Sequence, residues 1–85
     1  MSKPITKYID DVEPTLKDMQ EFVSGYIEVV YLNKESMMII DEEGKIKDKP
    51  INKEATDIAH KHQAIFNTDY IAGDAMILSG DARLS

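Results

Sequence analysis

Three consecutive carboxylates, at Asp41, Glu42 and Glu43, form the densest group of side chains in this sequence that could do chemistry. Oxygen ligands of this kind suit hard cations such as calcium or magnesium, but a dedicated cation loop spaces its carboxylates along the chain and adds backbone carbonyl ligands. This stretch lacks that spacing. It therefore predicts an exposed acidic turn in preference to a metal site, with Gly44 at a positive φ.

The two histidines, His60 and His62, are the other residues that suggest a metal. Two positions apart on a helix, their side chains project about 200° apart around the axis and cannot share one ion. The chain has no cysteine, which excludes disulfides, thiolate metal sites and thiol nucleophiles. We therefore expect neither a metal nor a cofactor.

Catalysis by a nucleophile needs a serine or similar group beside a base, and the spacing of serine, histidine and acidic residues suggests no such pair. We therefore expect that the protein is not an enzyme. A binding site for an anionic, nucleotide-like ligand is one alternative, with Glu28, Glu43, Lys45 and Asn52 meeting near the turn and the free N–H groups of a helix start. Glu28 itself has two interpretations: a solvent-facing sheet edge, or a carboxylate in a pocket beside Tyr26.

Composition narrows the classes of partner. The 85 residues suffice for one domain, and 16 acidic against 10 basic residues give a net charge of -6. A chain without surplus cations does not suit a nucleic-acid phosphate backbone. No apolar run is as long as that of a signal peptide or of a membrane span. We therefore expect a cytoplasmic protein that binds neither nucleic acid nor membrane.

A helix is predicted to begin at Thr15, because Asp18 stands three residues later and both side chains can satisfy free N–H groups of a first turn. Apolar residues then recur at helical spacing, which indicates one buried stripe. We expect Gly25 to hold the left-handed position that ends this helix. The stripe consists of Leu16, Met19, Phe22 and Val23.

The stretch 25–44 changes to strand periodicity and predicts a β-hairpin in the middle of a small sheet. Residues 26–32 alternate in character, whereas Met37 to Ile40 are continuously apolar, as in a strand covered on both faces. Lys45 to Lys47 are expected to begin a short return strand. Asn52 then caps a second helix, and Ala75 to Leu78 form the last strand.

The resulting fold class is α+β: a small, mainly antiparallel sheet built on the central hairpin and packed with two short helices that cover one face. Residues 1–12 are expected to be a flexible lead or an edge strand around Ile5 to Ile9. Residues 13–80 form one compact domain, and residues 81–85 a loose tail.

Four short motifs along residues 13 to 80 resemble a family of small phage and mobile-element proteins known as domain of unknown function 3846. One departure is Lys53-Glu54, where the family pattern has a basic pair, and this argues against a basic, anion-binding helix start. The motifs are Ser24-Gly25-Tyr26-Ile27-Glu28, Asp41-Glu42-Glu43-Gly44-Lys45, Pro50-Ile51-Asn52 with Ala55-Thr56, and Ile71-Ala72-Gly73-Asp74-Ala75.

The resemblance implies a phage-type accessory protein in a bacterial cytoplasm. We expect it to be non-enzymatic, a monomer or homodimer, and to bind a host protein as a modulator or inhibitor of a defence or regulatory component. The acidic tip is the first candidate surface, and the face around Tyr26, Val30 and Tyr31 is the second. The candidate binding residues are Tyr26, Glu28, Asp41, Glu42, Glu43, Lys45 and Asn52.

Overall fold

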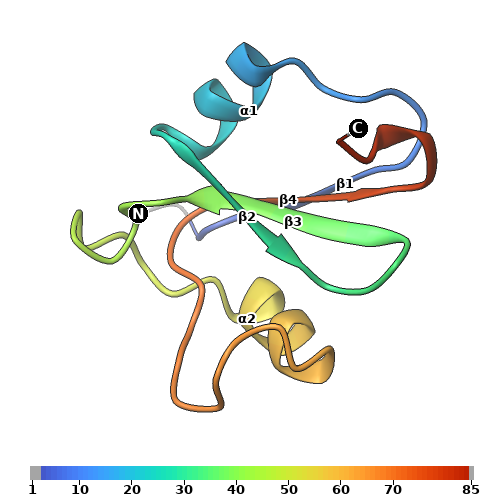
Figure 1. The fold of residues 1–85 in the computed structure, drawn as a ribbon. Coiled ribbons are helices and arrows are strands. Elements are labelled where there is room, and N and C mark those ends of the chain that lie inside the picture. The colour runs from blue at the N-terminus through green and yellow to red at the C-terminus, as the bar shows by residue number, and fades with distance from the viewer. Residues whose placement is uncertain (1–2, 85) are drawn as a thin grey trace.

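A four-stranded sheet forms the centre of the structure, a computed structural model that describes residues 3–84 (Figure 1). The strand order is β1-β4-β3-β2. The β2–β3 and β3–β4 pairs are antiparallel and the β1–β4 pair is parallel. The small, mainly antiparallel α+β fold is thus confirmed. The strands are β1 (Thr6–Ile9), β2 (Ile27–Tyr31), β3 (Ser36–Asp41) and β4 (Ala75–Ser79).

The predicted hairpin is present as β2 and β3, but it does not lie in the middle of the sheet. Of the two hairpin strands only β3 is interior to the sheet, because β4 pairs with its other side. Strand β2 forms one edge of the sheet. This position agrees with its sequence, because Glu28 and Tyr31 are exposed whereas every residue of β3 after Ser36 is buried.

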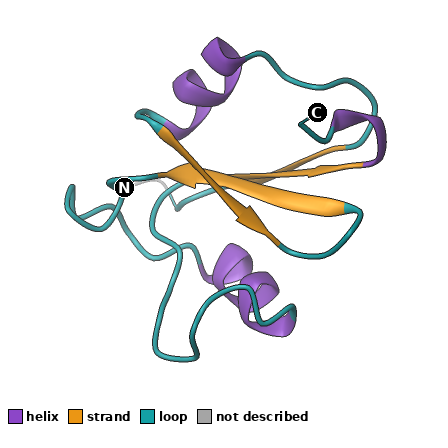
Figure 2. Ribbon diagram, viewed as in Figure 1, coloured by secondary structure: helices purple, strands orange, loops and turns teal. Residues whose placement is uncertain are grey.

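The two helices, α1 (Leu16–Val23) and α2 (Lys53–Lys61), cover opposite faces of the sheet (Figure 2). The expectation that both would cover one face is therefore wrong. Successive side chains of a strand point to opposite faces, and β3 and β4 are apolar at nearly every position. Both faces of these strands consequently need a cover, and one helix supplies each.

Two apolar clusters result, one on each face. Met19 and Val23 of α1 pack on one face, and Ala55 and Ala59 of α2 pack on the other. The α1 cluster also contains Met37, Ile39, Met76, Leu78 and Ala82, and the α2 cluster contains Val30, Leu32, Met38, Ile40, Ile71, Ala75 and Ile77.

Helix α1 begins as predicted. The Thr15 side chain accepts a hydrogen bond from the Asp18 N–H, and Asp18 accepts one from the Thr15 N–H in return. Its end differs from the prediction, because Ser24, with φ 61°, occupies the left-handed position expected for Gly25. Gly25 has a different role, which its contacts with the neighbouring turn explain.

The first and last segments of the described range, residues 3–84, are both ordered parts of the fold. Strand β1 is the edge strand that was expected around Ile5 to Ile9. The loose tail expected from Asp81 is instead packed: Asp81 and Ala82 complete a short 3-10 helix (Gly80–Ala82), and Ala82 is fully buried. Beyond it, the Arg83 guanidinium donates to the Lys34 carbonyl at 2.7 Å, and Leu84 packs against the α1 cluster. Residues 1, 2 and 85 lie outside the described range.

Candidate functional site

Asp41, expected at the exposed tip of the acidic turn, is instead buried at its base, where only 1% of its side chain is exposed. One carboxylate oxygen accepts the Glu43 N–H at 2.8 Å. The other lies 3.0 Å from Lys47 Nζ and 2.6 Å from Lys49 Nζ. A buried carboxylate requires partners of this kind, so the acidic tip contains two residues, Glu42 and Glu43, and not three.

These contacts fix the charge of Asp41. Burial alone raises the pKa of this carboxyl, but the hydrogen bonds from Lys49, the Glu43 N–H and Lys47 outweigh burial and hold the pKa below its usual value. The side chain is therefore ionised at neutral pH.

The same two lysines bind the end of α1. Lys49 Nζ donates to the Val23 carbonyl at 2.5 Å, and Lys47 Nζ donates to the Ser24 carbonyl at 3.2 Å. Cations are favourable at this end of a helix. Asp41, Lys47 and Lys49 thus join the end of β3, the end of α1 and the turn between β3 and α2 into one unit, here called the Asp41 clamp.

Gly25 leaves the space that the clamp occupies. A Cβ atom at this position would lie 2.5 Å from Lys47 Nζ and 2.7 Å from Asp41 Oδ1. The position requires the absence of a Cβ atom and not a left-handed backbone.

Residues 42–48 form successive hydrogen-bonded turns, and the short return strand expected at Lys45 to Lys47 is absent. The Lys47 N–H donates to the Glu43 carbonyl at 3.0 Å and the Lys49 N–H to the Gly44 carbonyl at 3.0 Å. These bonds turn the lysines back towards Asp41. Within the turn, Asp48 takes the positive φ of 56° that was expected at Gly44.

Gly44 is constrained by contact. It is buried, and a Cβ atom there would lie 2.7 Å from the backbone oxygen of Ala72. Because a backbone atom cannot move aside as a flexible side chain can, any larger residue must displace the turn from the segment before β4.

We predict that Gly44→Ala lowers the free energy of unfolding by about 1–2 kcal/mol in urea, and that Gly44→Asn costs at least as much. A left-handed backbone would favour asparagine over alanine, so the pair distinguishes the two causes. Asp48→Gly is the matched control and should be neutral or slightly stabilising, because it relieves the positive φ. An unchanged urea midpoint and slope for Gly44→Ala would contradict the close approach.

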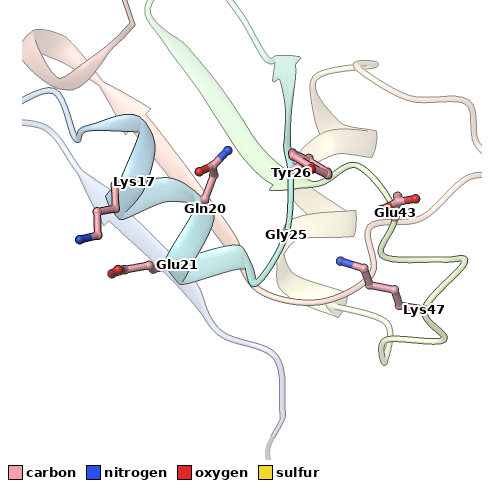
Figure 3. Close-up of a pocket in the computed structure, with 7 residues that line it drawn as sticks. All are labelled: Lys17, Gln20, Glu21, Gly25, Tyr26, Glu43 and Lys47. Carbon is pink, nitrogen blue, oxygen red and sulfur yellow. The ribbon is translucent and has the colours of Figure 1, made fainter.

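An open groove lies between α1 and the turn, with a volume of about 350 Å³ (Figure 3). Tyr26 stands at its centre with 68% of its surface exposed. Helix α1 forms one wall and the turn forms the other, with Glu43 beside Lys47. The remaining lining residues are Lys17, Gln20, Glu21 and Gly25.

A second groove, with a volume of about 300 Å³, is lined in part by Glu28, Asp41, Glu42 and Lys45. Glu28 is exposed on the edge strand, which confirms the first of its two interpretations. The Lys45 ammonium forms an ion pair with Asp69, whose pKa this hydrogen bond lowers, and lies 4.7 Å from the centre of the Tyr70 ring. Apart from Asn52, the candidate residues are thus divided between two grooves.

Asn52 lies in neither groove. It is 2% exposed, and its amide donates to the carbonyls of Ile5 and Gly73 while its oxygen accepts the Ala55 N–H. Beside it, the Glu54 carboxylate accepts a hydrogen bond from the Tyr8 hydroxyl, so negative charge already occupies this helix start. The expectation that Asn52 meets Glu28, Glu43 and Lys45 at an anion site is therefore wrong.

Metal ligands do not gather either. Among residues 3–84, no three histidine or acidic side chains are placed to hold one ion. Nε2 of His60 lies 2.8 Å from the Asp69 carbonyl oxygen, a contact that ties α2 to the following loop.

The sequence interpretation missed the roles of Lys47 and Lys49. A signal for them was present: a carboxylate that directly ends a fully apolar strand must be buried, and a buried carboxylate needs cations. The lysines that follow at alternate positions supply them.

Together these features define a small α+β domain whose four-stranded sheet has one helix on each face and whose open grooves meet at a clamped turn. The chain belongs to the family described as a domain of unknown function, DUF3846, whose sequence model matches residues 2–83. No curated protein and no solved structure matches the chain.

Neither helix in the described part of the chain has the length and apolar character needed to cross a membrane.

Proposed function

We propose that this chain is a small non-enzymatic protein that binds another protein through the groove around Tyr26. The observation that carries the proposal is the exposed Tyr26 ring at the centre of a groove whose walls the Asp41 clamp holds in place. Exposed tyrosines on rigid supports are typical binding hot spots, because they bury a large area at a small entropic cost.

The charges around the groove indicate the chemistry of the partner. Glu21 and Glu43 line it together with Lys17 and Lys47, but Lys47 is already paired with Asp41. Glu42 adds a further exposed carboxylate on the turn. With a net charge of -6, the chain attracts a basic surface over a long range. We infer a partner patch with a basic rim and an apolar centre.

The family resemblance suggests where such binding occurs. We propose a phage-type accessory protein that acts in the cytoplasm of a bacterial host and modulates or inhibits a host defence or regulatory protein. The alternative, a binder of small anionic ligands, has less support, because the free N–H groups it required lie beside Asn52 and Glu54 and away from both grooves.

The test compares immobilised wild-type chain with Tyr26→Ala and with the double variant Glu42→Lys, Glu43→Lys in extracts of the host, followed by kinetics on the purified captured protein. Tyr26→Ala should weaken binding about tenfold or more. The double variant should keep its fold, because exposed turn charges change stability by less than ~0.5 kcal/mol, and should associate more slowly with a reversed salt dependence.

Glu35→Lys is the control for charge, because it places a lysine in the exposed loop at the opposite end of the hairpin. Its association rate should stay closer to that of the wild type than the rate of the single variant Glu43→Lys, which carries the same change in net charge and is measured beside it. Equal capture of a host protein by wild type and by Tyr26→Ala would show that the groove is not the binding surface.

A further inference from the structure

Strand β2 presents an open edge. Within the described chain, β2 pairs only with β3. Two backbone bonds mark the side of β2 that faces β3: the Glu42 N–H donates to the Tyr26 carbonyl, and the Leu32 N–H donates to the Ser36 carbonyl. Backbone groups alternate along a strand, so those of Glu28 and Val30 also face β3. The N–H and C=O groups of the residues in between therefore point outward. These residues are Ile27, Val29 and Tyr31.

The two edges of the sheet differ in protection. Strand β1, at the other edge, follows Pro4 and carries Lys7, both of which discourage pairing with another strand. Strand β2 has no proline, lysine or bulge, and its one charge, Glu28, belongs to a residue whose backbone faces inward. Unprotected edges of this kind are templates for a further strand.

Exposed apolar side chains surround this edge. Tyr31 is 71% exposed and Phe66 is 83% exposed. Between β2 and the segment after α2 lies a groove of about 590 Å³, whose lining includes Val30, Tyr31, Ile65 and Phe66. An apolar surface beside unpaired backbone groups is typical of an interaction site.

We propose that the occupant of this edge is a second copy of the chain, paired antiparallel through β2 with Val29 opposite Val29 of the second copy. In this register Ile27 faces Tyr31 of the second copy, and each facing pair exchanges two backbone hydrogen bonds. The arrangement has two-fold symmetry. The β2 edge of each copy is then occupied by the β2 edge of the other, so the contact closes as a dimer and does not extend into a filament.

The spacing along β2 favours this register over its neighbours. A symmetric antiparallel pair can be centred on a hydrogen-bonded pair or on a non-hydrogen-bonded pair, so every residue of β2 is a possible centre. Centring on Glu28 leaves Tyr31 unpaired and sets Glu28 opposite Glu28 of the second copy, and centring on Val30 leaves Ile27 unpaired. Centring on Ile27 leaves Tyr31 unpaired, and centring on Tyr31 leaves Ile27 unpaired. Only the Val29 register uses all outward groups, and it sets Glu28 opposite Val30 of the second copy, so no like charges face each other.

The dimer does not rest on the function proposed for the Tyr26 groove, which is formed by α1 and the turn. Sedimentation equilibrium of the purified full chain tests it directly. We expect a concentration-dependent rise from 9.6 kDa to about twice that mass.

Amide hydrogen exchange of the same wild-type chain tests the register without a variant. The amides of Val30 and Leu32 bond to β3 and should be protected at every concentration. Those of Ile27, Val29 and Tyr31 should gain protection only as the dimer forms. This alternation of period two is specific to pairing along β2.

A matched pair of variants completes the test. Tyr31→Pro removes an outward N–H without touching the bonds to β3, because proline is tolerated where the N–H of an edge strand faces outward. It should raise the dimer dissociation constant about tenfold or more, whereas Tyr31→Val, which keeps the N–H, should change it by less than about threefold.

Three results would overturn the proposal. The first is a monomer at every concentration up to about 1 mM, the weakest range of specific association. The second is a dimer in which the three outward amides exchange as fast as in the monomer. The third is protection of these amides only when a different protein is added, which would assign the edge to that partner.

Discussion

Asp41→Asn is expected to lower the free energy of unfolding by about 2–4 kcal/mol, because it removes the buried carboxylate that pairs with Lys47 and Lys49. The amide can still accept the Glu43 N–H, so the turn keeps one of its bonds. Its NH₂ group, however, points at the Lys47 and Lys49 ammonium groups, which lie 3.0 and 2.6 Å from the carboxylate oxygen in the wild type. A donor then faces two cations.

The estimate stays below the largest values for broken buried pairs because Lys47 and Lys49 keep some contact with water, at 37% and 20% side-chain exposure. Urea unfolding at pH 7 measures the difference, and Glu42→Gln is the control. Glu42 is exposed and should change stability by less than ~0.5 kcal/mol. A wild-type midpoint for Asp41→Asn would show that the clamp contributes nothing.

The same carboxyl predicts a pH dependence. Its folded-state pKa lies below the value of the unfolded chain, so the unfolded state binds the proton more tightly. The stabilisation from Asp41 is therefore complete above the unfolded pKa of about 4 and is lost as the pH falls through the folded-state pKa. The difference in stability between wild type and Asp41→Asn should shrink over that range. A difference that stays constant down to low pH would contradict the lowered pKa.

The elements of the fold could be predicted because their signals are local. A capping threonine, an asparagine before an apolar stripe and a continuous apolar run each specify an element from its own residues. The placement of the helices required one further step. Met37 to Ile40 indicated a strand covered on both faces, and that pattern already demanded a cover on each side.

The turn was harder to predict because its features depend on residues distant in the sequence. Gly44 is a glycine on account of the Ala72 carbonyl, and Gly25 on account of Lys47 and Asp41. Nothing adjacent to either glycine reports such contacts, so a positive φ was the natural interpretation. The acidic run has the same difficulty: its first residue belongs to the strand and is buried, and its last two belong to the surface.

The residues of the predicted binding site lie apart in the structure for a related reason. Asn52 was predicted correctly as a helix cap, but a cap with a second, buried set of partners is no longer free to bind a ligand. Exposure therefore decides which of the candidate residues remain available, and it depends on tertiary packing. Exposed candidates are Tyr26, Glu28, Glu42, Glu43 and Lys45, and the proposed binding function rests on Tyr26, Glu42 and Glu43.

Asn52→Ala is the second substitution with a large expected effect, a loss of about 2–4 kcal/mol in the free energy of unfolding. Removing an N-cap typically costs about 1 kcal/mol. In addition, the buried Gly73 carbonyl, which accepts from the Asn52 amide at 3.1 Å, loses that donor, and an unsatisfied buried acceptor costs about 1–3 kcal/mol. The amide also reaches the Ile5 carbonyl at 3.3 Å, so the change loosens β1, α2 and the start of β4 together.

Asn52→Ser separates the two contributions, because serine restores the cap to the Ala55 N–H but is too short to reach Gly73. It should recover about 1 kcal/mol of the loss caused by alanine and no more. Urea unfolding gives both values, and exchange of the Ala55 amide reports the cap alone. If serine restored wild-type stability, Asn52 would act as a cap only. If alanine itself left the midpoint and slope unchanged, the buried amide would not hold the three elements together.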